Sequence, residues 1–227
     1  PVTIPLFQQI DETEQKKVAA KTEEQGGAQT EGETQASKGA TVRHALGITG
    51  TNREKVYSYV QTLLVDYATH HSPQDAMLYV AGTNESRMHW RWAYALPHCK
   101  EADRSATLCF EEEQLPNENE LDRMRLFWRN LRTILERRRM RLQDKESGAD
   151  VRLPFLLVVV DVQGATPDWS ALHDLEGEAT ISTILLDGQM LGAGILFLVP
   201  ERSNVPSRCN AVIEVDVDVN ANSAVFR

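Results

Sequence analysis

The turn over residues 47–59 (GITGTNREKVYSY) stands where a phosphate-binding loop would stand, directly after a hydrophobic segment. Such a loop has the spacing GxxxxGK[ST], because backbone N–H groups beside the glycines wrap the phosphates, the lysine contacts the β- and γ-phosphates, and the hydroxyl binds Mg²⁺. Gly50 supplies the first glycine. Lys55, Val56 and Tyr57 stand where the second glycine, the lysine and the hydroxyl are required. Since one residue of helix turns by ~100°, a lysine one position early cannot be assumed to point to the same place, and we expect a structural turn with at most weak anion binding at the helix N-terminus.

A second candidate for chemistry ends the hydrophobic run of residues 156–164 (LLVVVDVQG). This pattern is typical of a Walker B strand, in which the aspartate assists Mg²⁺ and a following glutamate polarises the attacking water. Asp161 is present, but the next residue is Val162, which can neither accept a proton nor orient water. An aspartate at a strand end is also a common turn residue. We therefore expect no catalytic residue and no metal site, only a vestigial nucleotide site of Gly50, Lys55 and Asp161.

Two further pairs of reactive side chains have simpler interpretations. Glu201 and Arg202 follow another hydrophobic strand, where a nucleotide sensor could lie, but we favour a solvated loop. His98 and Cys99 are neighbours without further ligands at metal spacing, so we expect no zinc site.

The composition, 41% hydrophobic and 25% charged over 227 residues, is that of a soluble globular protein with enough chain to bury a core. The formal net charge of −9 disfavours a surface built mainly for nucleic acid, because phosphate contacts need clustered lysine and arginine. One basic run is assigned to the polar side of a long helix, with a nucleic-acid-binding face as the alternative: Arg137, Arg138, Arg139 and Arg141.

The three cysteines include no CxxC pair, which disfavours a disulfide framework and favours a reducing compartment. No run approaches the ~18 apolar residues of a membrane span, and no signal-peptide pattern opens the chain. Because the first residue is Pro1 rather than Met, we expect an excised fragment, and a membrane anchor could lie outside it.

Composition divides the chain into three parts. Residues 1–10 are apolar and predict a first strand, and residues 41–227 predict the main α/β domain. Residues 11–40 hold Val18 as their only large aliphatic residue, so they cannot bury enough surface to offset the entropy of ordering. We expect this segment to be a disordered acidic and polar insertion, with an acidic partner-binding arm as the alternative.

Within the main domain, strand and helix patterns alternate. Thr51 with Glu54 predicts a capping box for the first helix. Trp90 and Trp92 alternate like an extended segment, with packing as the default interpretation and an aromatic contact surface as the alternative. The predicted strands are 41–49, 76–81, 107–110, 153–160, 192–199 and 211–215, and the predicted helices are 51–70, 119–145 and 178–191. Repeated strand–helix–strand units predict an α/β fold with a mostly parallel, doubly wound sheet, helices on both faces and ligands beyond the carboxyl ends of the strands.

Four segments occur in an order shared with a known family: GTNREKVYSYVQTLLVDYATHHSPQDA, WRWAYALPHC, RLPFLLVVVDVQG and LGAGILFLVPERSNVPSRCNAVIEV. In them the chain resembles the FtsK/SpoIIIE-type ATPases of type VII secretion systems (EssC/EccC-like), over roughly residues 41–215. Within that family the chain resembles the ATPase-like domain that precedes the first ATPase module. The resemblance implies a P-loop NTPase-like (RecA-like) fold with a degenerate nucleotide site. Gly50 then matches the first P-loop glycine and Asp161 the Walker B aspartate, while the chain departs from the family at the lysine, hydroxyl and glutamate positions.

The resemblance also implies a membrane-anchored, hexamer-forming motor for protein secretion that hydrolyses ATP in its other modules. The departures predict that this fragment is not an enzyme but a non-catalytic structural or regulatory module, without a cofactor and with ATP and Mg²⁺ as weak ligands at most. The implied partners are adjacent ATPase modules of the same polypeptide, neighbouring subunits and secretion-system components, on the cytoplasmic side of the cell membrane and without nucleic acid. Two alternatives stay open: a weak nucleotide-binding or ATPase module using Lys55, Asp161 and Glu201, and part of a DNA translocase.

Overall fold

The structure is a computed structural model that describes residues 44–110, 118–143, 153–163, 175–215 and 224–226. The chain divides into the units Pro1–Arg43 and His44–Arg227, and the described fold belongs to the second. The predicted first strand (1–10) and the predicted insertion (11–40) lie outside the described residues.

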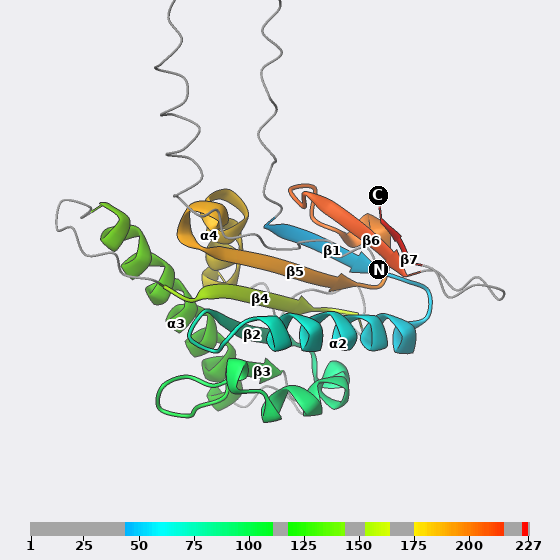
Figure 1. Ribbon diagram of the computed structural model, residues 1–227, viewed down its shortest axis with the longest axis horizontal. Coiled ribbons are helices and arrows are strands. Elements are labelled where there is room, and N and C mark those ends of the chain that lie inside the picture. Colours follow the sequence, from blue (N-terminus) through cyan, green and yellow to red (C-terminus); the bar gives the residue numbers. More distant parts are fainter. Residues whose placement is uncertain (1–43, 111–117, 144–152, 164–174, 216–223, 227) are drawn as a thin grey trace, which may run out of the picture. The chain divides into compact units, whose positions relative to one another are not determined.

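The core of the fold is a seven-stranded sheet in the order β3-β2-β4-β5-β1-β6-β7 (Figure 1). Every neighbouring pair is parallel except β6 with β7, which confirms the predicted mostly parallel sheet. The central strands are nearly continuous hydrophobic runs, as expected for strands covered on both faces. The strands are β1 (Ala45–Thr49), β2 (Ala76–Gly82), β3 (Leu108–Phe110), β4 (Phe155–Asp161), β5 (Ala193–Val199), β6 (Ala211–Val215) and β7 (Ala224–Phe226).

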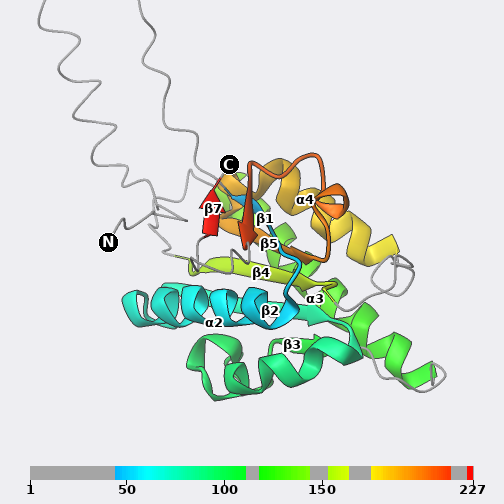
Figure 2. The ribbon, with the colours of Figure 1, turned by 90° about the vertical axis from the view of Figure 1, so that its right-hand side faces the viewer.

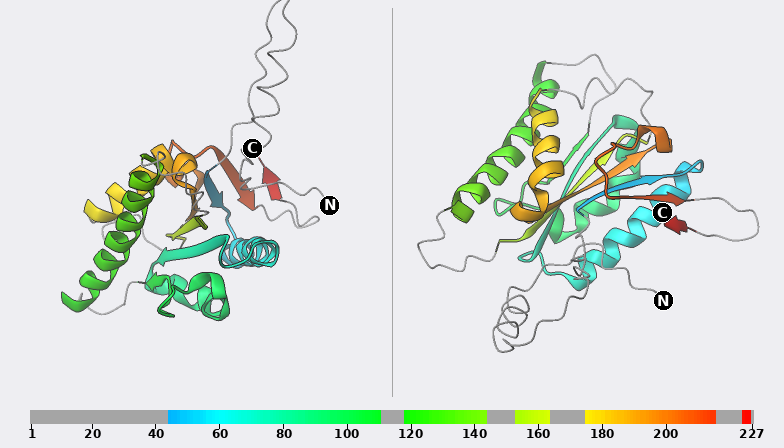
Figure 3. Two further views of the ribbon diagram at one scale, coloured as in Figure 1. Left: turned by 60° about the vertical axis from the view of Figure 1, so that its left-hand side comes forward. Right: turned by 90° about the horizontal axis from the view of Figure 1, so that it is seen from above.

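Helices cover both faces of the sheet, with α2 on one side and α3 and α4 on the other (Figures 2 and 3). The doubly wound arrangement predicted from the sequence is therefore confirmed. None of the described helices is both long and apolar enough to cross a membrane. The α-helices are α2 (Arg53–His70), α3 (Glu118–Gln143) and α4 (Leu175–Leu191), and the 3-10 helices are η1 (Asn84–Ala95), η2 (Pro97–Cys99) and η4 (Arg202–Asn204).

Strand alternation decides which side chains of β4 face which helices. Leu156, Val158 and Val160 belong to one buried cluster with Trp128 of α3 and residues of α4. Residues at the intervening positions face the α2 side of the sheet. Asp161, the last residue of β4, therefore lies on the α2 side.

The start of α2 differs from the prediction. The helix begins at Arg53 and its N-cap is Asn52, whose side-chain oxygen accepts a hydrogen bond from the N–H of Lys55 at 3.1 Å. The predicted capping box of Thr51 and Glu54 is wrong, because Asn52 is itself a preferred N-cap residue and stands one position closer to the helix.

The tryptophan segment is also not extended. Trp90 and Trp92 lie in η1, with their ring centroids 5.9 Å apart. Trp90 is 1% exposed and packs inside the fold, as in the default interpretation. An alternating pattern of two tryptophans was too short to separate a strand from helical turns.

The basic run on α3 does not lie wholly on its polar side. Arg138 is 4% exposed and donates hydrogen bonds to the carbonyl oxygens of Leu191, Gly192 and Pro154. Burial lowers the pKa of Arg138 to about 10. The assignment of Arg138 to the solvent side is wrong, because this guanidinium satisfies carbonyl groups at the end of α4 and before β4. Arg137 is exposed, as predicted.

Candidate functional site

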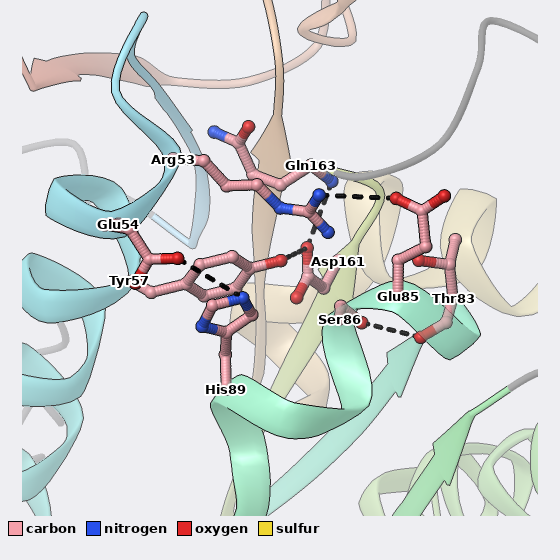
Figure 4. Close-up of polar contacts among 9 residues, drawn as sticks. All are labelled: Arg53, Glu54, Tyr57, Thr83, Glu85, Ser86, His89, Asp161 and Gln163. Atoms are coloured by element: carbon pink, nitrogen blue, oxygen red, sulfur yellow. Dashed lines mark hydrogen bonds and ion pairs between the residues drawn. The ribbon is translucent and has the colours of Figure 1, made fainter.

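The predicted site residues lie at the carboxyl edge of the sheet, where α/β folds bind ligands. Only β5 separates β1, which leads into α2, from β4, which ends in Asp161. Tyr57 extends from the second turn of α2 and donates its hydroxyl hydrogen to Asp161 at 3.2 Å (Figure 4). The position that should carry the Mg²⁺-binding hydroxyl and the position of the Walker B aspartate are thus in direct contact.

Both oxygens of the Asp161 carboxylate accept hydrogen bonds. Oδ1 accepts from the Tyr57 hydroxyl and from the backbone N–H of Gln163 at 3.1 Å. Oδ2 accepts from the indole N–H of Trp90 at 2.7 Å. The side chain is 0% exposed. Asp161 is therefore a closed polar centre under α2 and η1.

The electrostatics of the pair follow from this burial. Loss of hydration raises the pKa of Asp161, and the hydrogen bonds from Trp90, Gln163 and Tyr57 oppose that rise. Burial also raises the pKa of Tyr57, and the neighbouring carboxylate raises it further, against the opposing charge of Arg53. Tyr57 therefore remains a protonated donor at neutral pH.

The ring of Tyr57 is held from both sides. His89 of η1 stacks on it at 3.8 Å between centroids and an interplanar angle of 6°. The guanidinium carbon of Arg53 lies 5.9 Å from the ring centroid, and Arg53 Nη1 pairs with Glu85 of η1 at 3.3 Å. A longer contact of 3.9 Å joins His89 to Glu54 (Figure 4). These contacts fasten η1 to the start of α2.

The turn before α2 is short and tightly packed. β1 ends at Thr49 and α2 begins at Arg53, so the helix starts before Lys55, the position of the second P-loop glycine. The N–H of Lys55 is bonded to Asn52. A Cβ added at Gly50 would lie 2.5 Å from the backbone oxygen of Val215, so the turn lies against β6.

These residues do not fit a Mg²⁺–triphosphate in the described conformation. Mg²⁺ needs octahedral oxygen ligands and usually keeps several waters, whereas both oxygens of Asp161 are occupied and the side chain has no exposed surface. The turn also does not form the glycine-flanked loop in which successive N–H groups face a phosphate. Among the described residues, no three His, Cys, Asp or Glu side chains are grouped as a metal site.

The other predicted positions make contacts of their own. Arg202 pairs with Glu214 at 2.6 Å, and Glu201 accepts a hydrogen bond from Ser203 at 3.2 Å on an exposed loop. Val162 is buried in the cluster on the α3 and α4 side. The sensor-like pair and the residue at the glutamate position thus take no part in the centre.

The sequence did not reveal the residues of η1 that contact Asp161, Tyr57 and Arg53. Trp90 stood out only as part of an aromatic segment, and His89 and Glu85 did not stand out at all. These residues reach α2 because the chain over residues 83–99 returns toward that helix. Local sequence patterns do not predict this path. The one available signal was a hydroxyl at Tyr57, one residue after the missing lysine.

No protein-family model and no curated protein sequence matches the chain. Solved structures do match its fold. The cytoplasmic domain of EssC matches with a TM-score of 0.55 and 17% identity, over 81% of this chain and 40% of that one. ATPases 2 and 3 of EssC from Geobacillus thermodenitrificans match with a TM-score of 0.53 and 18% identity, over 78% of this chain and 33% of that one. The cytoplasmic domain of the type VII secretion ATPase EccC from Thermomonospora curvata matches with a TM-score of 0.51 and 16% identity, over 75% of this chain and 20% of that one.

The chain thus spans two fifths or less of each of these three structures. At such identities the likeness concerns the fold. The chain shares its mostly parallel α/β fold with these EssC and EccC structures, and the resemblance had implied this fold.

Proposed function

We propose that this domain is a non-catalytic structural or regulatory module of a multi-domain secretion motor of the EssC and EccC kind. The observation that carries the proposal is the closed centre at Asp161, where Tyr57 and Trp90 donate to the carboxylate that would otherwise assist a metal ion. The ATPase-type fold, and the small share of each neighbour that the chain spans, support a module among others.

The closed centre also suggests how such a module works. A ligand shifts a conformational equilibrium only if it binds the two conformations with different affinities. A nucleotide-driven domain therefore needs a nucleotide site that differs between its two conformations. Here contacts between protein groups, made by Tyr57, Trp90 and His89, join α2 and η1 to each other and to β4. In the proposal the domain acts as a rigid part, through contacts with adjacent ATPase modules and hexamer neighbours, on the cytoplasmic side of the membrane that anchors the parent protein.

Thermal unfolding with and without Mg²⁺–ATP tests the proposal. A ligand at ~100 times its Kd stabilises the folded state by ~2.7 kcal/mol, which is visible as a rise in Tm. We expect no such rise with millimolar nucleotide, and no ATP turnover by the purified chain. A Mg²⁺-dependent rise in Tm with turnover, both lost in Lys55→Ala and Asp161→Ala, would overturn the proposal.

Weak nucleotide binding is the second candidate, and one observation favours it. The side-chain nitrogen of Gln163, close to Asp161, is buried without a hydrogen-bond partner among the described residues. A buried donor without a partner costs free energy, and an anion admitted by a local opening would relieve that cost. If this candidate is right, Gln163→Leu weakens the nucleotide-dependent rise in Tm.

A further inference from the structure

The solvent side of α3 is a concentrated arginine surface. Between residues 123 and 143 the sequence contains no lysine, and Glu136 is its only acidic residue. Seven arginines of this stretch are exposed, and we call them the α3 arginine face: Arg123, Arg125, Arg129, Arg132, Arg137, Arg139 and Arg141.

Helix geometry explains why these arginines share one side. The buried residues of α3 recur at helical spacing and form one inward stripe: Met124, Trp128, Leu131, Leu135 and Arg138. At ~100° per residue, the seven arginines fall on the remaining arc. From Arg123 to Arg141 the face extends over about 27 Å, from the 1.5 Å rise per residue. Its length and solvent position are those of a surface that a partner could contact.

The charge of this face is opposite to that of the rest of the chain. Seven arginines and Glu136 sum to +6, so the remainder of a chain with net charge −9 carries −15. Such segregation creates a local positive potential on an acidic protein, which attracts an acidic partner to this side alone.

The described contacts show that the face accepts carboxylates. Arg132 Nε pairs with Glu136 at 2.9 Å along the helix, and Arg139 pairs with Asp187 of α4. Guanidinium groups match carboxylates through parallel hydrogen bonds, which an ammonium group cannot reproduce. Arg129, Arg137 and Arg141 lie outside these two ion pairs.

We propose that the α3 arginine face is the docking surface for an acidic protein segment. Protein–protein interfaces are enriched in arginine and methionine and depleted in lysine, which is the composition of this face. Two apolar side chains stand among the arginines, Leu126 at 44% and Met140 at 57% exposure, and these suit a peptide better than a phosphate backbone.

The other polyanions fit less well. A phosphate backbone has no apolar side chains that could cover the exposed Leu126 and Met140. A membrane-surface helix inserts its apolar side into the lipid, but Trp128 and Leu131 of α3 are 0% exposed within the protein core.

Fluorescence anisotropy tests the assignment with a labelled peptide of about 20 residues composed of Glu and Leu, which as a helix spans ~30 Å and so covers the length of the face. The triple variant Arg129→Glu, Arg137→Glu, Arg141→Glu should weaken binding of the intact chain about tenfold or more, because three favourable charge contacts become repulsive. The matched control Arg91→Glu, Lys100→Glu, Arg208→Glu makes the same charge change at exposed positions outside α3 and should change affinity about twofold at most. Arg→Lys at the three α3 positions keeps the charge and should weaken binding less than charge reversal.

Circular dichroism confirms first that each variant is folded. Equal affinities of the wild type and the α3 triple variant overturn the proposal, as does equal loss in the control. It is also overturned if the wild type does not bind the peptide. Tighter α3-dependent binding to a DNA duplex or to phosphatidylglycerol vesicles replaces the acidic protein segment with that class of partner.

Discussion

Tyr57 stands at the position of the Mg²⁺-binding hydroxyl but makes a different contact in the structure. Judged from the sequence alone, it is a loss, because a tyrosine replaces the short hydroxyl that binds Mg²⁺. In the structure the phenol is long enough to reach the carboxylate of Asp161 and donates a hydrogen bond to it at 3.2 Å. A buried carboxylate needs such donors, since loss of hydration without hydrogen bonds is costly. At this position the departure from the motif therefore supplies a hydrogen bond that helps to keep the aspartate buried.

We predict that Tyr57→Phe lowers the free energy of unfolding by about 1.5–3 kcal/mol at neutral pH, the usual range for a hydrogen bond to a charged group. The Tyr57 hydroxyl lowers the pKa of Asp161 against the rise caused by burial. Removing it raises that pKa further, so the loss of stability should be larger where Asp161 is ionised and smaller at acid pH, where it is protonated. Urea unfolding at several pH values measures both effects.

Tyr59→Phe is the matched control, since Tyr59 lies on the same helix and is partly buried, but its hydroxyl has no hydrogen-bond partner among the described residues. It should change stability by about 0.5 kcal/mol or less. Equal effects of the two substitutions, or a Tyr57→Phe effect independent of pH, would show that the hydroxyl does not support the carboxylate.

At the scale of elements, Arg138 ties α3 to two segments that follow it in the chain. Its guanidinium donates to the carbonyls of Leu191 and Gly192 at the end of α4 and to the carbonyl of Pro154 before β4. Arg138→Met keeps much of the side-chain volume but leaves buried carbonyls without donors, so it should cost about 3 kcal/mol. Arg137→Met, one residue earlier and exposed, should cost about 0.5 kcal/mol or less. Chemical denaturation of the two variants measures the difference in their stability. Similar denaturation midpoints would contradict the structural role of Arg138.

The start of α2 provides a second test of an element boundary. Asn52→Ala removes the side-chain acceptor of the Lys55 N–H and should destabilise the fold by about 1 kcal/mol. Thr51→Ala should have an effect of a few tenths of a kcal/mol, because Thr51 is exposed and lies outside the cap. Chemical denaturation measures both variants. A larger loss of stability in Thr51→Ala than in Asn52→Ala would support the capping box expected from the sequence.

At the scale of the whole molecule, the sequence predicted the fold better than the site. Hydrophobic runs such as residues 153–160 and the breaks around them are local signals, so the alternation of strands and helices and the parallel sheet were predictable. The contact of Trp90 with Asp161 joins residues 71 positions apart, and the burial of Arg138 depends on where α4 ends. Both result from chain topology, which no single segment contains.

The final prediction concerns the molecule as a whole at alkaline pH. Four of the five tyrosines, Tyr57, Tyr59, Tyr67 and Tyr79, have pKa values raised by burial above the ordinary 10.0. Burial likewise raises the pKa of Cys99 and of Cys209 from 9.0 to about 12. The unfolded chain thus releases these protons first, so their contribution to stability is complete below pH 9 and is lost as the pH rises from there through the raised values. Each group that is ionised only in the unfolded state lowers the stability by ~1.4 kcal/mol per pH unit.

We therefore expect the urea midpoint to fall steeply above pH 9, and most of the tyrosinate absorbance to appear together with the loss of circular dichroism. The chain unfolded in guanidinium is the control, since its tyrosines should titrate near their ordinary pKa of 10.0. Tyrosinate absorbance that reaches its full value while the circular dichroism stays native would mean that these side chains are open to solvent. The packing of Tyr57 under η1, on which the closed centre depends, would then be wrong as well.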